Sequence, residues 1–111
     1  MAHYVIILGA GKGSRIQNQL IPKQFLEIKK LPIIMHSIYA FSQYNSNIKF
    51  YIGLPQNYIK LWDKLCRKYD FHIKCNLFPG GKERVNTVFR GLNLIARENV
   101  INNDVDIISI H

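Results

Sequence analysis

The sequence predicts an α/β fold, a three-layer sandwich in which helices cover both faces of a mainly parallel β-sheet. The first observation is that short apolar segments alternate with longer segments of helical periodicity, in the order strand, helix, strand, helix, strand, helix, strand. Such alternation implies βαβ units with right-handed crossovers. The second observation is that two glycine-rich segments each follow a predicted strand. Because ligands of such sheets bind beyond the carboxyl ends of the strands, we expect both segments to lie at that edge.

The first half of the chain starts with an apolar run at residues 3–8, which is typical of a strand buried in a parallel sheet. Residues 9–22 are expected to form a loop, and residues 25–28 a short extended piece. Pro32 stands where a helix would begin, since proline suits the first helical turn. Apolar residues then recur near helical spacing until about Tyr44.

The middle of the chain repeats this pattern. Residues 48–54 are the second predicted strand, and Pro55 opens an amphipathic helix whose apolar face extends to Tyr69 and whose other face is mostly basic. Residues 73–78 form a third apolar run. The glycines of residues 79–82 then predict a turn.

A third helix follows, with its apolar side chains at positions i, i+3, i+4, i+7 and i+10, namely Val85, Val88, Phe89, Leu92 and Ile95. The segment 102–104 ends it, and residues 105–110 are the fourth predicted strand. We expect the apolar face of this strand to be exposed, or the strand to be poorly held, because no helix follows to cover it. The pattern is that of a Rossmann-like sandwich truncated after its fourth main strand, and therefore of a fragment of a longer protein.

Composition narrows the class of protein. A chain of 111 residues suffices for one small domain, and its 48% hydrophobic content argues against disorder. No apolar run approaches the roughly 20 residues that span a membrane, and no secretory signal is recognisable, so no membrane partner is expected. The two cysteines form neither a C-x-x-C pair nor a disulfide framework. A reducing, cytoplasmic location is therefore predicted.

The formal charge of +8 would suit a polyanionic partner. However, the basic residues are scattered from Lys12 to Arg97 and lack aromatic residues expected to be exposed beside them. A solvated basic surface is therefore favoured, and no nucleic-acid partner is expected. A non-catalytic α/β module that binds phosphate or RNA remains the alternative from another class.

The first glycine-rich loop follows the first strand and carries three glycines, two cations and a hydroxyl, in the order Gly9, Ala10, Gly11, Lys12, Gly13, Ser14 and Arg15. Glycines let backbone amides approach an anion, and an arginine can bind two phosphate oxygens at once. The dinucleotide-binding motif fails because Ser14 replaces its third glycine, and the P-loop motif fails because Ile6 replaces its first. A triphosphate site and a flexible loop with incidental charge both remain open at this point.

A lysine follows the loop at Pro22-Lys23-Gln24-Phe25. Lys23, held by the preceding proline, could point back at a ligand of the loop and neutralise charge that develops on a reacting phosphate. Transfer of a nucleotidyl group needs mainly such positioning and charge stabilisation.

The second glycine loop reads Gly80-Gly81-Lys82-Glu83-Arg84. From the residues alone, a nucleotide-binding loop and a tight turn between strand and helix are equally supported. In the second case Arg84 is a surface residue that anchors the loop.

The two loops together resemble a known family. Leu8 to Phe25 is similar to the signature of nucleotidyltransferases that activate sugar and polyol phosphates, a glycine loop ending in arginine and then Pro-Lys-Gln-Phe/Tyr-Leu. The second loop, with Thr87-Val88 and Gly91-Leu92 after it, is similar to the Gly-Gly-x-x-Arg…Ser-Val…Gly-Leu stretch of the 2-C-methyl-D-erythritol 4-phosphate cytidylyltransferases.

The resemblance implies roles for particular residues. Arg15 and Lys23 would be catalytic and stabilise the transition state, and residues 9–14 would cradle the triphosphate and part of the nucleotide of CTP. Gly80, Gly81, Lys82 and Thr87 would lie at the cytosine and ribose, with pyrimidine choice set by close backbone approach at the two glycines. Lys82 stands where an acidic residue is common in the family.

The resemblance also implies an activity and its partners. The natural protein would transfer CMP from CTP to a polyol phosphate, 2-C-methyl-D-erythritol 4-phosphate, in the non-mevalonate route to isoprenoid precursors, or alternatively to ribitol 5-phosphate. It would use Mg²⁺ and form a homodimer. Residues 1–111 would be the N-terminal, nucleotide-binding part of one nucleotidyltransferase domain. The metal-binding aspartate is expected after His111, so we expect the isolated chain to lack metal ligands and to be inactive.

Overall fold

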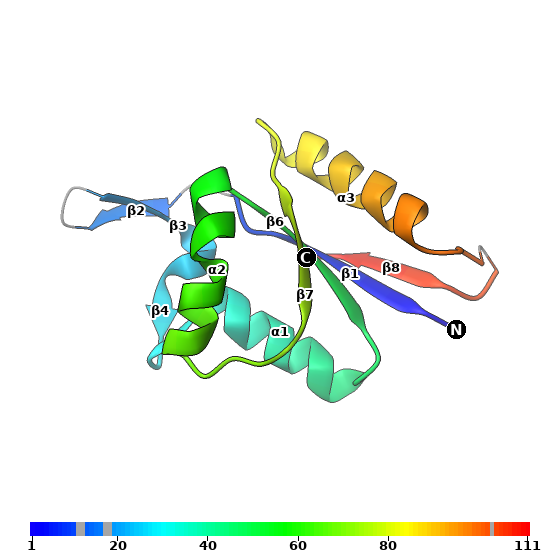
Figure 1. The fold of residues 1–111 in the computed structure, drawn as a ribbon, viewed down its shortest axis with the longest axis horizontal. Coiled ribbons are helices and arrows are strands. Elements are labelled where there is room, and N and C mark those ends of the chain that lie inside the picture. The colour runs from blue at the N-terminus through cyan, green and yellow to red at the C-terminus, as the bar shows by residue number, and fades with distance from the viewer. Residues whose placement is uncertain (11–12, 17–18, 103) are drawn as a thin grey trace.

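The computed structural model describes residues 1–10, 13–16, 19–102 and 104–111, with the backbone alone over 13–16 and 19–20. Over this part of the chain, four parallel strands form the central sheet in the order β7-β6-β1-β8 (Figure 1). Their bounds are β1 His3–Leu8, β6 Lys49–Leu54, β7 Cys75–Pro79 and β8 Ile107–Ile110. The predicted α/β class and parallel sheet are confirmed.

Helices cover both faces of the sheet. Successive residues of β1 point to opposite sides, and because all of them are apolar or buried, both sides need a covering layer. Val5 and Ile7 pack with the core under α1 (Ile33–Tyr44) and α2 (Gln56–Lys68). Tyr4 and Ile6 pack on the other side under α3 (Arg84–Glu98). Figure 1 shows α3 on the side of the sheet opposite to α1 and α2. All six residues of β1 are buried, as the continuous apolar run predicts for a central parallel strand.

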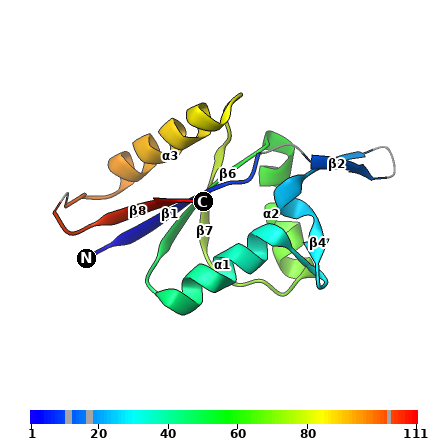
Figure 2. The ribbon, with the colours of Figure 1, turned by 180° about the vertical axis from the view of Figure 1, so that it is seen from behind.

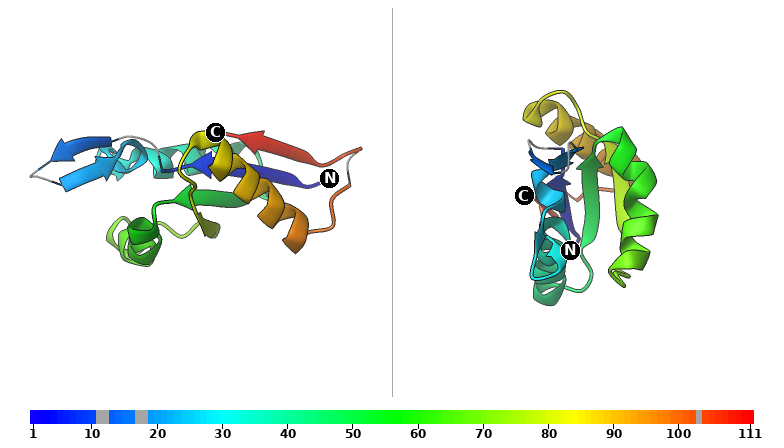
Figure 3. Two further views of the ribbon diagram at one scale, coloured as in Figure 1. Left: turned by 90° about the horizontal axis from the view of Figure 1, so that it is seen from above. Right: turned by 90° about the vertical axis from the view of Figure 1, so that its left-hand side faces the viewer.

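The segment predicted as a loop contains an antiparallel hairpin, so that prediction is wrong in part. β2 (Gly13–Ile16) pairs with β3 (Gln19–Pro22), and Figure 3 shows the hairpin projecting from one end of the molecule. Its strands are short and carry too little apolar alternation to be recognised. The 3₁₀ helix η1 (Lys23–Phe25), β4 (Glu27–Ile28) and β5 (Leu31–Pro32) follow.

The buried face of α3 agrees only in part with the predicted one. Ile95 is buried as predicted, but Val85 and Phe89 are 51% and 60% exposed, and Thr87 and Gly91 are buried against the sheet in their place. Val88 and Leu92 pack partly against the same core. Close contact between the helix and the sheet favours small residues over large apolar ones, and this displaces the buried stripe.

β8 forms one edge of the sheet beside β1, where His3 pairs with Ile107 and Ile6 with Ile110 (Figure 2). The side chains of Ile107, Ile108 and Ile110 are 44%, 37% and 47% exposed, which confirms the predicted exposure of this strand. In the part of the chain described above, no helix is long and apolar enough to cross a membrane.

Candidate functional site

The two glycine-rich segments meet at one pocket beyond the carboxyl ends of the strands. Its volume is about 360 Å³, and it is lined by Leu8, Ala10, Gly81, Lys82, Glu83, Arg84 and Thr87. Leu8 ends β1 and Ala10 lies just after it, and the others come from the β7–α3 connection and the start of α3. The predicted meeting of the two segments at this edge is therefore confirmed.

The first loop leaves β1 in close contact with β6. The Gly9 amide donates to the carbonyl of Gly53 at 2.8 Å. A Cβ at position 9 would lie 2.6 Å from Leu54 Cδ2 and 3.0 Å from the Gly53 oxygen, so a larger residue here would require the Leu54 side chain to shift. Since its amide is already bonded within the sheet, Gly9 shapes the loop rather than donating to a ligand.

The second loop is packed against the first. A Cβ at Gly80 would lie 2.9 Å from the Cβ of Ala10, and one at Gly81 would lie 2.3 Å from the Cβ of Asn86. The Gly80 amide donates to the Leu54 carbonyl at 2.8 Å. The glycines thus permit two backbone segments and the start of α3 to approach more closely than any side chain would allow.

Thr87 holds the second loop from inside. Its side chain is only 3% exposed, and its hydroxyl accepts a hydrogen bond from the Gly81 amide at 2.9 Å and donates to the Glu83 carbonyl at 3.4 Å. In this arrangement both hydroxyl functions serve the loop. Contact of Thr87 with a base stays a prediction.

The first turn of α3 faces the pocket with a helix N-terminus. The Glu83 side chain accepts from the Asn86 amide, and Asn86 Oδ1 accepts from the Glu83 amide at 3.0 Å, which completes a capping box. Lys82 and Arg84 flank this turn and are exposed. The positive end of the helix dipole lies here with two cations, and the Glu83 carboxylate at the N-cap offsets part of their charge.

Lys23 lies on the segment that follows the β2–β3 hairpin. It is exposed and opens η1, and the adjacent Phe25 is buried against Tyr58, with the two ring centroids 4.3 Å apart. This packing fixes the backbone that carries the lysine. Lys23 does not line the 360 Å³ pocket, so its approach to the nucleotide stays a prediction.

The remaining predicted residues of the first loop are those at positions 11–15. Gly11 and Lys12 lie outside the described residues. Gly13, Ser14 and Arg15 form the start of β2, for which the backbone alone is described. Convergence of Lys12, Arg15 and Lys23 on one ligand therefore stays a prediction.

Comparison with known proteins shows to which family the chain belongs. The model of the family described as IspD, 2-C-methyl-D-erythritol 4-phosphate cytidylyltransferase, matches residues 3–107. The chain belongs to this family. The matched region contains both glycine loops and Lys23, and all four strands of the sheet begin within it.

Individual family members agree. A protein of Bacteroides thetaiotaomicron named 2-C-methyl-D-erythritol 4-phosphate cytidylyltransferase is 33% identical to this chain, over 91% of this chain and 46% of the relative. A protein of the same name in Azobacteroides pseudotrichonymphae is 40% identical, over 80% of this chain and 40% of the relative. The relative in Bacteroides fragilis is 32% identical over 100% of this chain and 47% of its own length. The chain thus spans less than half the length of these relatives.

Two lining residues were not assigned to the nucleotide site from the sequence. Leu8 is the last residue of β1, and Glu83 is the N-cap of α3. Glu83 gave little signal, because a capping box usually has Ser or Thr at the N-cap and Glu or Gln three residues later, whereas here the pair is Glu83 and Asn86. Arg84 was left without a definite role and lines the pocket.

The described residues do not form a magnesium site. Among them, no three His, Cys, Asp or Glu side chains gather as metal ligands. The carboxylate in the pocket, Glu83, is engaged in capping α3. His111, after which the family aspartate is expected, continues the line of β8, where its amide donates to the Ile6 carbonyl at 2.8 Å.

Proposed function

We propose that the natural protein transfers CMP from CTP to 2-C-methyl-D-erythritol 4-phosphate. An oxygen of the acceptor phosphate attacks the α-phosphorus of CTP, the bond between the α-phosphorus and the bridging oxygen breaks, and pyrophosphate leaves. The observation that carries the proposal is that Ala10 of the first glycine loop and residues 81–84 of the second line one pocket, in a chain of the cytidylyltransferase family.

The shape of this pocket supports a pyrimidine nucleotide. Gly80 lies against Ala10, and Gly81 lies against Asn86, so the backbone itself forms the wall on that side. As the family resemblance implies, this close backbone approach would exclude the second ring of a purine. Ser14 and the cations at positions 12, 15 and 23 are proposed to bind the phosphates, where Arg15 and Lys23 stabilise the charge of the transition state.

The described residues do not fit a magnesium ion, because their one pocket carboxylate caps α3. No step is therefore assigned to a metal held by this part of the chain. A homodimer, implied by the family resemblance, is likewise part of the proposal and is tested by light scattering of the natural protein.

The test is CMP transfer by the natural protein. CTP should be used in preference to ATP or GTP, and 2-C-methyl-D-erythritol 4-phosphate in preference to ribitol 5-phosphate. Lys23→Ala and Arg15→Ala should each lower kcat by about 10²-fold or more, the effect of removing a group that stabilises developing charge. Lys60→Ala, which removes an exposed lysine of α2, is the matched control and should leave kcat unchanged.

Three results would contradict the proposal. Equal use of purine nucleotides would remove the assignment to cytidine. Preference for ribitol 5-phosphate would favour the sister activity. Saturable retention on RNA without any CMP transfer would favour a binding module.

A further inference from the structure

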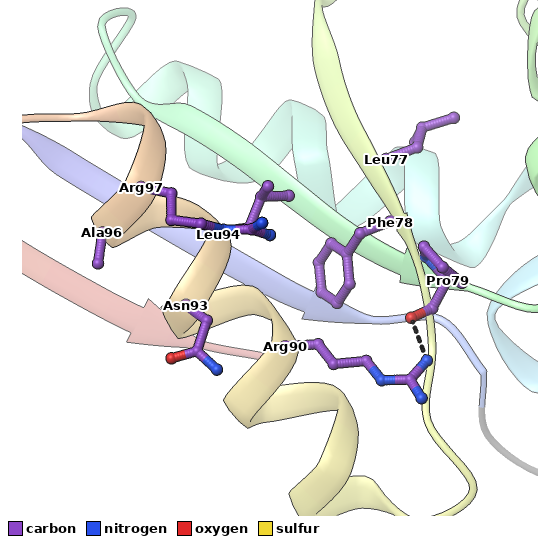
Figure 4. Close-up of a pocket in the computed structure, with 8 residues that line it drawn as sticks. All are labelled: Leu77, Phe78, Pro79, Arg90, Asn93, Leu94, Ala96 and Arg97. Atoms are coloured by element: carbon purple, nitrogen blue, oxygen red, sulfur yellow. Dashed lines mark hydrogen bonds between the residues drawn. The ribbon is translucent and has the colours of Figure 1, made fainter.

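Two side chains of α3 hold one peptide group of the second loop from opposite ends. The Gly81 amide donates to Thr87 Oγ1 at 2.9 Å. The carbonyl of the same peptide, that of Gly80, accepts a hydrogen bond from Arg90 Nη1 at 3.2 Å. The same Arg90 nitrogen donates to the Pro79 carbonyl at 3.1 Å, and Figure 4 shows this contact. Thr87 and Arg90 are three residues apart and so lie on the same side of the helix.

A peptide group between two glycines needs such restraint. Neither neighbour has a side chain, so the peptide plane could rotate at little steric cost. Gly81 lines the pocket, and rotation of this plane would change both the shape of the wall and the groups exposed on it. Hydrogen bonds at both the N–H and the C=O of the plane favour one orientation.

We propose that Arg90 is a positioning residue of the nucleotide site, which together with Thr87 locks the Gly80–Gly81 peptide in the orientation that receives the nucleotide. The proposal rests on the proposed function. Arg90 does not line the pocket, so it acts through the loop. Its contribution is preorganisation: the loop is ordered before the ligand arrives, and binding costs less conformational entropy.

The expected kinetic effect follows from the place of this loop. In the proposed function this peptide lies beside the cytosine and ribose, which do not react, so its contribution would be nearly equal in the ground state and the transition state. Loss of such uniform binding raises KM and leaves kcat almost unchanged. A catalytic group would instead lower kcat, and general damage to the fold would lower the amount of active protein.

The chain contains a matched control. Arg90 and Arg97 both line an open cavity of about 800 Å³ between β7 and α3, with Leu77, Phe78 and Leu94 on its apolar side. In Figure 4, Arg97 lies farther along α3, away from Pro79. Arg97 carries the same charge as Arg90 and lies on the same helix, but it is two turns farther from the Gly80–Gly81 peptide.

The test compares Arg90→Met, Arg90→Lys and Arg97→Met in the natural protein. Methionine keeps much of the aliphatic stem and removes the donors, and lysine returns a donor. Two quantities are measured, the KM and kcat for CTP in CMP transfer, and the hydrogen-exchange rate of the Gly81 amide without nucleotide. Arg90→Met should raise KM about fivefold or more with kcat changed less than twofold, and speed Gly81 exchange by a similar factor. Arg90→Lys should recover part of both effects.

The results separate this proposal from the proposed function. If Arg90→Met and Arg97→Met have the same KM and the same Gly81 exchange rate, the positioning role is refuted. The same holds if Arg90→Met lowers kcat and leaves KM unchanged. If the parent protein transfers no CMP but Arg90→Met still speeds Gly81 exchange, the lock on the peptide stands and the proposed function fails.

Discussion

Gly53 and Thr87 form a complementary pair whose exchange can be predicted from the structure. Gly53 lies in β6 beside the helix α3. A Cβ at this position would be 2.5 Å from Thr87 Cγ2 and 3.0 Å from Phe78 Cε2 and Cζ. Carbon atoms pack best at about 3.5–4.0 Å, so the overlap with the threonine methyl is about 1 Å. The methyl of Thr87 thus occupies the space that any side chain at position 53 would need.

The magnitudes follow from this overlap. Overpacking of this kind costs about 1–3 kcal/mol, partly offset by about 0.4–1 kcal/mol that alanine gains over glycine through the unfolded chain. We therefore expect Gly53→Ala to lower the free energy of unfolding by about 1.5 kcal/mol. Thr87→Ser removes the methyl but keeps the hydroxyl bonded to Gly81, and should cost about 1 kcal/mol.

The double variant should lose less free energy of unfolding than the sum of the two single losses. In Gly53→Ala/Thr87→Ser, the new methyl enters the space that the old one left, and only the Phe78 ring must shift by a few tenths of an ångström. A loss of about 0.5 kcal/mol for the double variant gives a coupling of about 2 kcal/mol, within the range observed for residues in contact.

The assay is urea unfolding of the four proteins, with the slopes compared to check that the unfolding transitions are equivalent. Gly91→Ala is the control, because a Cβ there meets Ile6 at 3.0 Å and Phe78 at 3.1 Å rather than Thr87. Thr87→Ser should not rescue it. Additivity of the Gly53 and Thr87 changes within about 0.5 kcal/mol would refute the packing argument.

Two further predictions concern stability. Lys29 and Lys30 have φ of 53° and 65° in the turn between β4 and β5, a backbone region that costs a residue with a side chain about 1–2 kcal/mol. Lys30→Gly should therefore raise the free energy of unfolding by up to about 1 kcal/mol in the same assay. A decrease in the free energy of unfolding would contradict the strain assigned to this turn. The amides of Ala2 and Asn102 donate to the Asp106 carboxylate and lower its pKa from the ordinary value of 3.8. The stabilisation from this lowered pKa is present above pH 3.8 and is lost as the pH falls through the lowered pKa. Asp106→Asn should therefore lower Tm more at pH 7 than at pH 2. Equal losses of Tm at the two pH values would contradict a contribution from the ionised carboxylate.

The prediction of the fold succeeded where burial and backbone propensity act on the same residues. β1 is apolar at every position because both of its faces are covered. α1 begins directly after Pro32 and ends at Tyr44, where the periodicity stops. In these elements the local pattern and the tertiary environment agree, so a short window of sequence contains the information.

The prediction failed where contacts between separate elements decide the outcome. Phe89 is in the apolar register of α3 and yet is 60% exposed, whereas Gly91 is buried because the helix comes within contact distance of Ile6. The β2–β3 hairpin depends on pairing between two short strands, such as Ser14 with Ile21. Neither the depth of a helix contact nor a strand pairing is encoded in the periodicity of one segment.

For the candidate site, the sequence by itself determined which residues are chemically suited to a nucleotide. Glycines after β1 and β7, with cations and hydroxyls beside them, are local features, and the carboxyl-edge rule for parallel sheets brings them to one side. Only the tertiary structure decided how the amides are used. Those of Gly9, Gly80 and Gly81 are bonded to Gly53, Leu54 and Thr87 respectively. The reason is physical: a hydrogen bond is directional and joins residues that can be far apart in the chain, so its partner is set by the packed backbone rather than by a motif.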